Sequence, residues 1–304
     1  MNPAISGLWP ALLHPLTPQG DLDPVLAIAH AKAMLAAGCD GVTLFGTTGE
    51  GPAFGVSERM GLLDALLAAG VRADQLVVTI SAVALPEAIA LGRHALARGV
   101  QRQMLMPPFY FRQPRDAGIV QAVSQVVRGI DSDDLRLVLY HLPAISSAGF
   151  SHAAIAELLR LHPKQVVAVK DSSADLPHTL GLVAAFPTLS VLVGAEPHIA
   201  PVMQAGGAGT ICGLANLAPN LVRRIVSAPA ALSAPDEHLM TRLLAVHAVF
   251  PDMPFVPVYK VMLAEQSGEA NWLAARPPLC LLEPHEEQAV RQSYRAIAGL
   301  LQGC

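Results

Sequence analysis

The sequence predicts an α/β protein: a (β/α)8 TIM barrel followed by a C-terminal helical extension. Short apolar segments of strand length alternate eight times with amphipathic segments of helix length in roughly the first 230 of the 304 residues, as is typical of parallel barrels. An open, doubly wound sheet uses the same units, but no GxGxxG follows the first strand. We therefore expect the barrel over residues 1–230 and the helical extension over residues 231–304.

Glycine, proline and capping residues delimit the elements. The expected strands are residues 7–16, 41–46, 75–81, 100–108, 135–143, 165–173, 189–196 and 209–217. The expected barrel helices are residues 23–38, 57–70, 86–99, 115–130, 151–163, 176–187, 197–207 and 218–228, and those of the extension are 236–250, 257–266 and 283–302. Ser57 is expected to be the N-cap of the second helix. The extension shows no chemistry of its own.

The chain is apolar for a protein in water, with 52% hydrophobic residues, 14% charged residues and a mean hydropathy of +0.43. No apolar run approaches the roughly 18 residues of a membrane-spanning helix. The N-terminal "MNPAISGLWP" lacks the basic and apolar regions of a signal peptide. We therefore expect a cytoplasmic protein whose apolar residues fill a buried parallel sheet and contacts between subunits.

Cysteine spacing and charge exclude several classes of protein. The four cysteines lie far apart, which indicates reduced thiols rather than disulfides or a zinc site. A net charge of −4 and a pI near 6.2 make nucleic acid an unexpected partner. The eleven histidines show no HExxH or other close ligand spacing, and no cluster of histidine and carboxylate ligands suggests a metal-dependent aldolase. We expect neither a metal nor a membrane partner.

Functional residues of such barrels lie at the C-terminal ends of the strands. Lys170, one of only four lysines in the chain, follows the apolar run at 166–169. Lysine is seldom buried unless it is paired or used in chemistry. A neutral amine there could attack a ketone and form a Schiff base. The alternatives are a structural lysine neutralised by Asp171 and one that reaches out to solvent at the rim.

Two further features of the sequence bear on the choice between a catalytic and a structural Lys170. Tyr140 ends the adjacent strand, and its hydroxyl could exchange protons with a carbinolamine, although a core tyrosine would look the same. "GTTGEG" at residues 46–51 offers hydroxyls and backbone N–H groups that could bind a carboxylate, or it could simply be a capped turn. Glu50 in this loop is expected to be a structural acceptor rather than a base.

Together, GTTGE, a Tyr-X-X-Pro strand end and Val-Lys-Asp-Ser resemble the dihydrodipicolinate synthase / N-acetylneuraminate lyase family of class I pyruvate aldolases. The resemblance implies that Lys170 forms a Schiff base with pyruvate or another 2-oxo acid and that Tyr140 relays protons. It implies that Thr47 links Tyr140 to Tyr110 of a neighbouring subunit in a dimer of dimers, and that Thr48 holds the substrate carboxylate. The further substrate-binding residues expected are Gly194, Glu196 and Ile211.

Departures from the family pattern bear on the substrate. Resemblance to the dihydrodipicolinate synthases themselves would imply an arginine two residues after the Tyr-X-X-Pro proline. Here Ile145 occupies that position. "YxxPAxS" is more similar to the branch that cleaves sialic acid or 2-keto-3-deoxy sugar acids. His141 and His14 replace an asparagine and a threonine; we expect His141 to be structural and consider His14 for the pocket wall.

Three functions follow as expectations. The first is a Schiff-base lyase that joins pyruvate to an aldehyde, cleaves the product or dehydrates a sugar acid, with no metal or organic cofactor. The second is dihydrodipicolinate synthesis from aspartate semialdehyde, which Ile145 disfavours. The third is a non-catalytic barrel that binds a 2-oxo acid.

Overall fold

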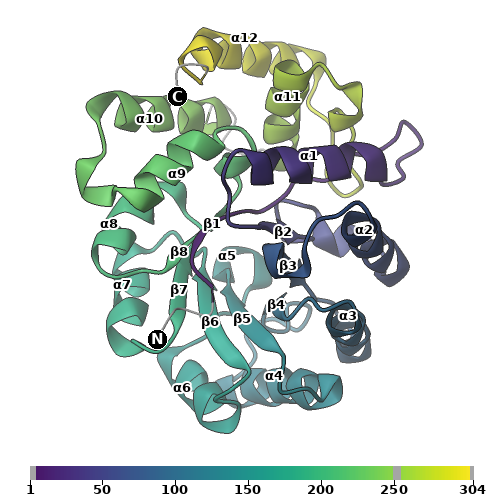
Figure 1. Ribbon diagram of the computed structural model, residues 1–304, viewed down its shortest axis with the longest axis vertical. Coiled ribbons are helices and arrows are strands. Elements are labelled where there is room, and N and C mark those ends of the chain that lie inside the picture. Colours follow the sequence, from purple (N-terminus) through teal and green to yellow (C-terminus); the bar gives the residue numbers. More distant parts are fainter. Residues whose placement is uncertain (1–4, 249–254, 302–304) are drawn as a thin grey trace.

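The barrel is formed by eight parallel strands, and the computed structural model describes residues 5–248 and 255–301 (Figure 1). The strands are β1 (Gly7–Pro10), β2 (Val42–Leu44), β3 (Leu76–Thr79), β4 (Arg102–Leu105), β5 (Arg136–His141), β6 (Val166–Asp171), β7 (Ser190–Val193) and β8 (Gly209–Cys212). They pair in sequence order from β2 to β8, and β8 pairs with β1. A parallel bridge between Ala11 and Thr43 joins the two ends, so the predicted (β/α)8 barrel is confirmed.

Helices cover the outside of the barrel. They are α1 (Pro24–Ala36), α2 (Val56–Ala68), α3 (Leu85–Ala97), α4 (Asp116–Ile130), α6 (His152–Leu161), α7 (Leu176–Ala185), α8 (Ile199–Gln204) and α9 (Pro219–Ser227). A short helix, α5 (Pro143–Ser146), follows β5 and was not expected. The prediction for Ser57 is wrong: α2 begins one residue earlier, after Gly55, whose N–H donates to Glu58 Oε2 over 2.8 Å.

Side chains alternate between the two faces of each strand. On β5, Val138 and Tyr140 belong to the core inside the barrel, whereas Leu137 and Leu139 pack beneath the helices. On β6, Ala168 likewise points inward and Val169 outward. The same alternation places Lys170 on the inner face, at the C-terminal end of its strand.

Three helices form the C-terminal part: α10 (Ala234–Ala248), α11 (Phe255–Ser267) and α12 (Pro284–Leu301). They lie together on the side of the barrel covered by α1 and α9 (Figure 1). The expected helices at 236–250 and 283–302 end in residues outside the described ranges. Within those ranges, no helix combines the length and apolar character needed to cross a membrane.

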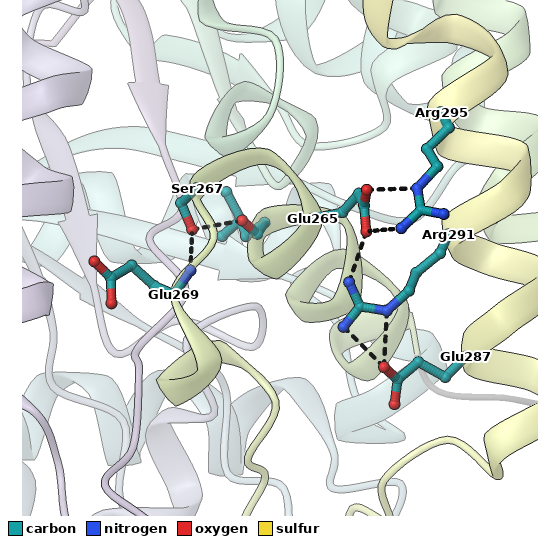
Figure 2. Close-up of polar contacts among 7 residues, drawn as sticks. Glu265, Ser267, Glu269, Glu287, Arg291 and Arg295 are labelled. Atoms are coloured by element: carbon teal, nitrogen blue, oxygen red, sulfur yellow. Dashed lines mark hydrogen bonds and ion pairs between the residues drawn. The ribbon is translucent and has the colours of Figure 1, made fainter.

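Glu265 connects α11 to α12 (Figure 2). Its carboxylate accepts hydrogen bonds from Arg291 Nη1 over 2.7 Å and from Arg295 Nε over 2.6 Å. These two arginines, with Arg295 the larger cause, hold the pKa of Glu265 below its usual value. Because the pKa of Glu265 is lower in the folded state, its contacts with the two arginines stabilise the fold at pH values above the unfolded-state pKa of about 4.5.

A Glu265→Gln variant is therefore expected to lower the free energy of unfolding by about 1 kcal/mol at pH 7. The difference from the wild type should disappear as the pH falls through the folded-state pKa, because Glu265 then becomes neutral in both proteins. Urea unfolding at pH 7 and pH 3 measures this. Glu157→Gln is the control, since that carboxylate forms an exposed pair with Arg160. An equal effect of the control would show that Glu265 has no special role.

Candidate active site

A cavity of about 250 Å³ opens at the C-terminal ends of the strands. Seven of the eight predicted site residues line it: Thr47, Thr48, Tyr140, Lys170, Gly194, Glu196 and Ile211. They come from β5, β6 and β8 and from the loops after β2 and β7. Residues distant in the sequence therefore converge where chemistry is expected in this fold.

Lys170 lies against Tyr140 on the floor of the cavity. The two residues are paired across β5 and β6, and Lys170 Nζ lies 4.1 Å from the centroid of the Tyr140 ring. Lys170 is only 3% exposed, yet no carboxylate lies within 4 Å of its Nζ in the described part of the chain. A buried amine that forms no close ion pair is suited to nucleophilic attack on a carbonyl.

Asp171 does not neutralise Lys170, because it points to the other face of β6. Its Oδ2 accepts hydrogen bonds from Thr179 Oγ1 over 2.7 Å and lies 2.9 Å from His178 Nδ1. Its Oδ1 accepts from the N–H of Ser173 over 2.8 Å. The alternative of a lysine paired with Asp171, or extended into solvent at the rim, does not describe this molecule.

The hydroxyl of Tyr140 lies 3.1 Å from Thr47 Oγ1. Tyr140 is 2% exposed, whereas Thr47 is partly exposed to the cavity, so this hydrogen bond lies at the cavity wall. The ring contacts the lysine while the hydroxyl reaches the loop after β2. A proton could thus pass between the two hydroxyls beside the amine.

The GTTGEG loop is fixed by the C-terminal part of the chain. Glu50 and Lys260 of α11 form an ion pair in which neither side chain is more than 2% exposed. Glu50 Oε2 also accepts from the N–H of Arg276 over 3.2 Å, and Lys260 donates to the carbonyl of Ala274 over 2.6 Å. Burial lowers the pKa of Lys260 against the opposing effect of Glu50. As expected, Glu50 is a structural acceptor.

His14 lies beneath the same loop and does not line the cavity. Its Nδ1–H donates to the carbonyl of Gly49 over 2.6 Å, and its ring stacks on Phe45. Burial lowers the pKa of His14 to about 3, so the ring is neutral at pH 7. A glycine is required at position 49, because a Cβ there would lie 2.6 Å from the His14 ring.

The remaining wall residues are held by backbone contacts. Glu196 Oε1 accepts from the N–H of Leu214 over 3.0 Å, and burial raises the pKa of this carboxyl. Burial also raises the pKa of the Cys212 thiol to about 12, so it is not a nucleophile at neutral pH. Gly194 allows close approach of the next loop, since a Cβ there would lie 2.0 Å from Ser172 Oγ.

Tyr110 is the one predicted site residue outside this cavity. Its side chain is 70% exposed and makes an edge contact with Phe111, itself 77% exposed. The cavity of a single chain therefore lacks Tyr110. Its role across a subunit interface stays a prediction.

Sequence reasoning missed the contribution of the extension to the cavity. Leu244 of α10 and both Phe255 and Tyr259 of α11 line it. Burial and then the nearby Glu196 raise the pKa of Tyr259 well above its usual value. The extension, expected to show no chemistry of its own, therefore contributes side chains to the cavity wall. The signal available in the sequence was Lys260, which follows Tyr259 and is one of only four lysines in the chain.

One histidine and carboxylate cluster was also not evident from spacing. His141, Asp171 and His178 place ligand atoms within 4.8 Å of one another on the outer face of β5 and β6. The rings of His141 and His178 stack with centroids 4.5 Å apart, and His141 Nδ1 accepts from the N–H of Phe150 over 2.9 Å. Nδ1 of each histidine thus has a hydrogen-bond partner, which agrees with the structural role expected for His141.

An eight-stranded barrel whose cavity holds a buried lysine amine against a tyrosine ring is typical of lyases of the class I aldolase type. The profile of the Dihydrodipicolinate synthetase family matches residues 4–297. The chain belongs to that family.

Similar proteins carry several names. An "Uncharacterized DapA-like lyase" of Chloroflexus aurantiacus is 32% identical over 96% of both chains. A 2-dehydro-3-deoxy-D-gluconate/2-dehydro-3-deoxy-phosphogluconate aldolase of Thermoproteus tenax is 30% identical over 90% of this chain and 85% of its own. The crystal structure of dihydrodipicolinate synthase from Agrobacterium tumefaciens, 31% identical, superimposes with a TM-score of 0.87 over 96% of this chain and 99% of that one.

Proposed function

We propose that Lys170 forms a Schiff base with a 2-oxo acid, pyruvate in the simplest case, and that the protein makes or breaks a bond at the adjacent carbon. The observation that carries this proposal is the buried Lys170 amine, 4.1 Å from the Tyr140 ring and without a carboxylate partner within 4 Å in the described chain. Thr48 lines the same cavity, and we propose that its hydroxyl and backbone N–H bind the carboxylate of the oxo acid.

The reaction follows from the imine. The amine adds to the carbonyl carbon, and loss of water from the carbinolamine gives the imine. Removal of a proton from the neighbouring carbon gives an enamine, which adds to an aldehyde carbon while the aldehyde oxygen takes a proton. Water then releases the 4-hydroxy-2-oxo acid and the free amine. The reverse sequence is cleavage. Dehydration begins instead from the imine of a 4-hydroxy-2-oxo acid: removal of a proton from carbon 3 gives its enamine, and the hydroxyl on carbon 4 then leaves as water with a proton. The imine is the electron sink, so we propose that no metal or organic cofactor takes part.

Borohydride trapping tests this assignment. Reduction in the presence of pyruvate should add one reduced pyruvate to the intact mass, and peptide mapping should find it on Lys170. Lys32, Lys164 and Lys260 are internal controls. The absence of an adduct, or an adduct on a control lysine, would sink the proposal and favour the non-catalytic 2-oxo-acid-binding barrel.

Replacing Tyr140 by phenylalanine should slow formation of the enamine by about 10²- to 10⁴-fold, because the proton relay to Thr47 is lost while the ring beside Lys170 remains. Exchange of the pyruvate methyl protons with D₂O, followed by NMR, measures this step without an aldehyde. Tyr294→Phe, at a buried tyrosine of α12, is the matched control. Unchanged exchange in Tyr140→Phe would exclude the hydroxyl from the relay.

The aldehyde partner defines the finer function. Ile145 in place of arginine argues against dihydrodipicolinate synthesis, although a dihydrodipicolinate synthase is among the similar structures. The sugar-acid aldolase or dehydratase expected from "YxxPAxS" agrees with the name of the Thermoproteus tenax relative and stays a prediction. Turnover of aspartate semialdehyde against keto-deoxy sugar acids compares the two.

We propose a homo-oligomer in which Tyr110 enters the cavity of a neighbouring subunit. Its exposure of 70%, next to the exposed Phe111, supports this role. Sedimentation of the wild type and of a Phe111→Glu variant tests it; a monomeric wild type that still exchanges pyruvate protons at full rate would contradict it.

A further inference from the structure

The outer part of the cavity is built largely from apolar side chains, with the polar Ser172, Glu196 and Tyr259 in the same lining. Beyond the strand ends, its wall includes six apolar residues from the segments after β5, β6 and β7, α5 among them, and from α10 and α11: Leu142, Ile145, Ala174, Ala195, Leu244 and Phe255. We call these six residues the outer wall. The catalytic candidates Lys170, Tyr140 and Thr47 lie deeper, at or just beyond the strand ends. A 2-oxo acid bound to Lys170 would leave the aldehyde partner against the outer wall.

We propose that this aldehyde carries an apolar group, aromatic or branched aliphatic, and no second carboxylate, phosphate or polyhydroxyl chain. The inference rests on the proposed Schiff-base function, specifies its second substrate and argues against the polyhydroxyl sugar acids expected from "YxxPAxS". Its product would be a 4-hydroxy-2-oxo acid with an apolar substituent on carbon 4, formed by one carbon–carbon bond with no oxidant or reductant.

An anionic aldehyde finds no cation on this wall. Among the described residues that line the cavity, Lys170 is the one lysine or arginine, and the proposed reaction uses it in the imine. Ile145 stands where the resemblance to dihydrodipicolinate synthases predicts an arginine. The one carboxyl in the lining, Glu196, offers no attraction to a second anion. Removing a carboxylate or phosphate from water without a partner is costly.

A polyhydroxyl chain finds too few polar partners. Three polar side chains, Ser172, Glu196 and Tyr259, accompany the outer wall, and Glu196 Oε1 already accepts from Leu214. Each hydroxyl brings one donor and two acceptor sites, and each group left unpaired in the cavity reduces affinity. An apolar substituent makes no such demand. It also removes apolar surface from water, including that of Ile145, which is 56% exposed at the cavity rim.

The test is a comparison of aldehydes in condensation with pyruvate. Benzaldehyde and 3-methylbutanal represent the apolar class, glyceraldehyde the polyhydroxyl class and succinic semialdehyde the anionic class. We expect kcat/KM for the better apolar aldehyde to exceed those of the other classes by at least about 10-fold. Faster turnover of glyceraldehyde or succinic semialdehyde, or equal turnover of all four, would overturn the inference.

Ile145→Arg sharpens this comparison. Because Ile145 is largely exposed, the variant should fold, and it should shift the kcat/KM ratio of succinic semialdehyde to benzaldehyde upward by about 10-fold or more. Leu161→Arg, at an exposed residue ending α6, is the control and should leave the ratio unchanged. An unchanged ratio in Ile145→Arg would contradict contact between this residue and the aldehyde.

Borohydride trapping with pyruvate alone, on the same preparations, tests the Schiff base separately from the class of aldehyde. Trapping on Lys170 together with a preference for polar aldehydes would overturn only the substrate class. Failure of trapping would overturn the Schiff base, and the inference with it.

Discussion

A Lys170→Ala variant is expected to exchange pyruvate methyl protons at least about 10⁴-fold more slowly than the wild type while folding normally. Alanine removes the amine that forms the imine, and no other amine lines the cavity among the described residues. The fold should persist because Lys170 has no carboxylate partner within 4 Å there, so its removal breaks no close ion pair. NMR in D₂O measures the exchange rate, and thermal unfolding checks the fold.

Two further variants make the result specific. Lys170→Arg keeps a positive charge but supplies no nucleophilic amine, so it should be as inactive as Lys170→Ala. Lys164→Ala removes an exposed lysine just before β6, near the opposite end of the strand, and should exchange at the wild-type rate. Exchange by Lys170→Arg above about one hundredth of the wild-type rate would mean that this side chain acts through its charge rather than as a nucleophile.

The barrel could be predicted from the sequence because its signals are local. Each strand is a short apolar run, and each helix has its own apolar face and terminal residues, so neither depends on distant contacts. Boundaries were less accurate. The first strand was expected over residues 7–16 but ends at Pro10, and the chain beyond it turns to place His14 beneath Gly49. That turn is set by a partner 35 residues away.

The closeness of Lys170 and Tyr140 could be predicted for a related reason. Lys170 and Tyr140 both end strands that are consecutive in the chain, and consecutive parallel strands are neighbours in a barrel. Strand alternation then settles the role of Asp171, which must face outward if Lys170 faces inward. The pairing of Tyr140 with Lys170 in the structure agrees with both steps.

The residues that the C-terminal helices contribute to the cavity could not be predicted, because their position depends on tertiary packing. Leu244, Phe255 and Tyr259 reach the cavity from helices that show no motif, and only the docking of α10 and α11 brings them there. His141, Asp171 and His178 likewise converge only in the folded chain. The ion pair between Glu50 and Lys260 joins residues 210 positions apart.

That ion pair gives the largest stability effect we expect. Lys260→Ala should lower the free energy of unfolding by about 3–5 kcal/mol, because Glu50 would remain buried without its cation. Water cannot solvate the Glu50 carboxylate in place of Lys260, since the side chains of Lys260 and Glu50 are 2% and 0% exposed. The GTTGEG loop should also loosen, so pyruvate proton exchange should fall along with stability. Urea unfolding and NMR exchange measure the two effects.

A double variant distinguishes the loss of a partner from the loss of packing. In Glu50→Gln/Lys260→Met no buried charge remains, so it should be more stable than Lys260→Ala, and it keeps the test valid if Lys260→Ala fails to fold. Lys164→Ala, which breaks the exposed pair with Asp133, should unfold at the same urea concentration as the wild type. If the double variant is no more stable than Lys260→Ala, the lysine acts through the hydrogen bond to Ala274 and the packing of its chain. If it recovers stability but not proton exchange, the charge pair fixes the conformation of the loop that carries Thr47 and Thr48, and the C-terminal helices are then part of the catalytic unit.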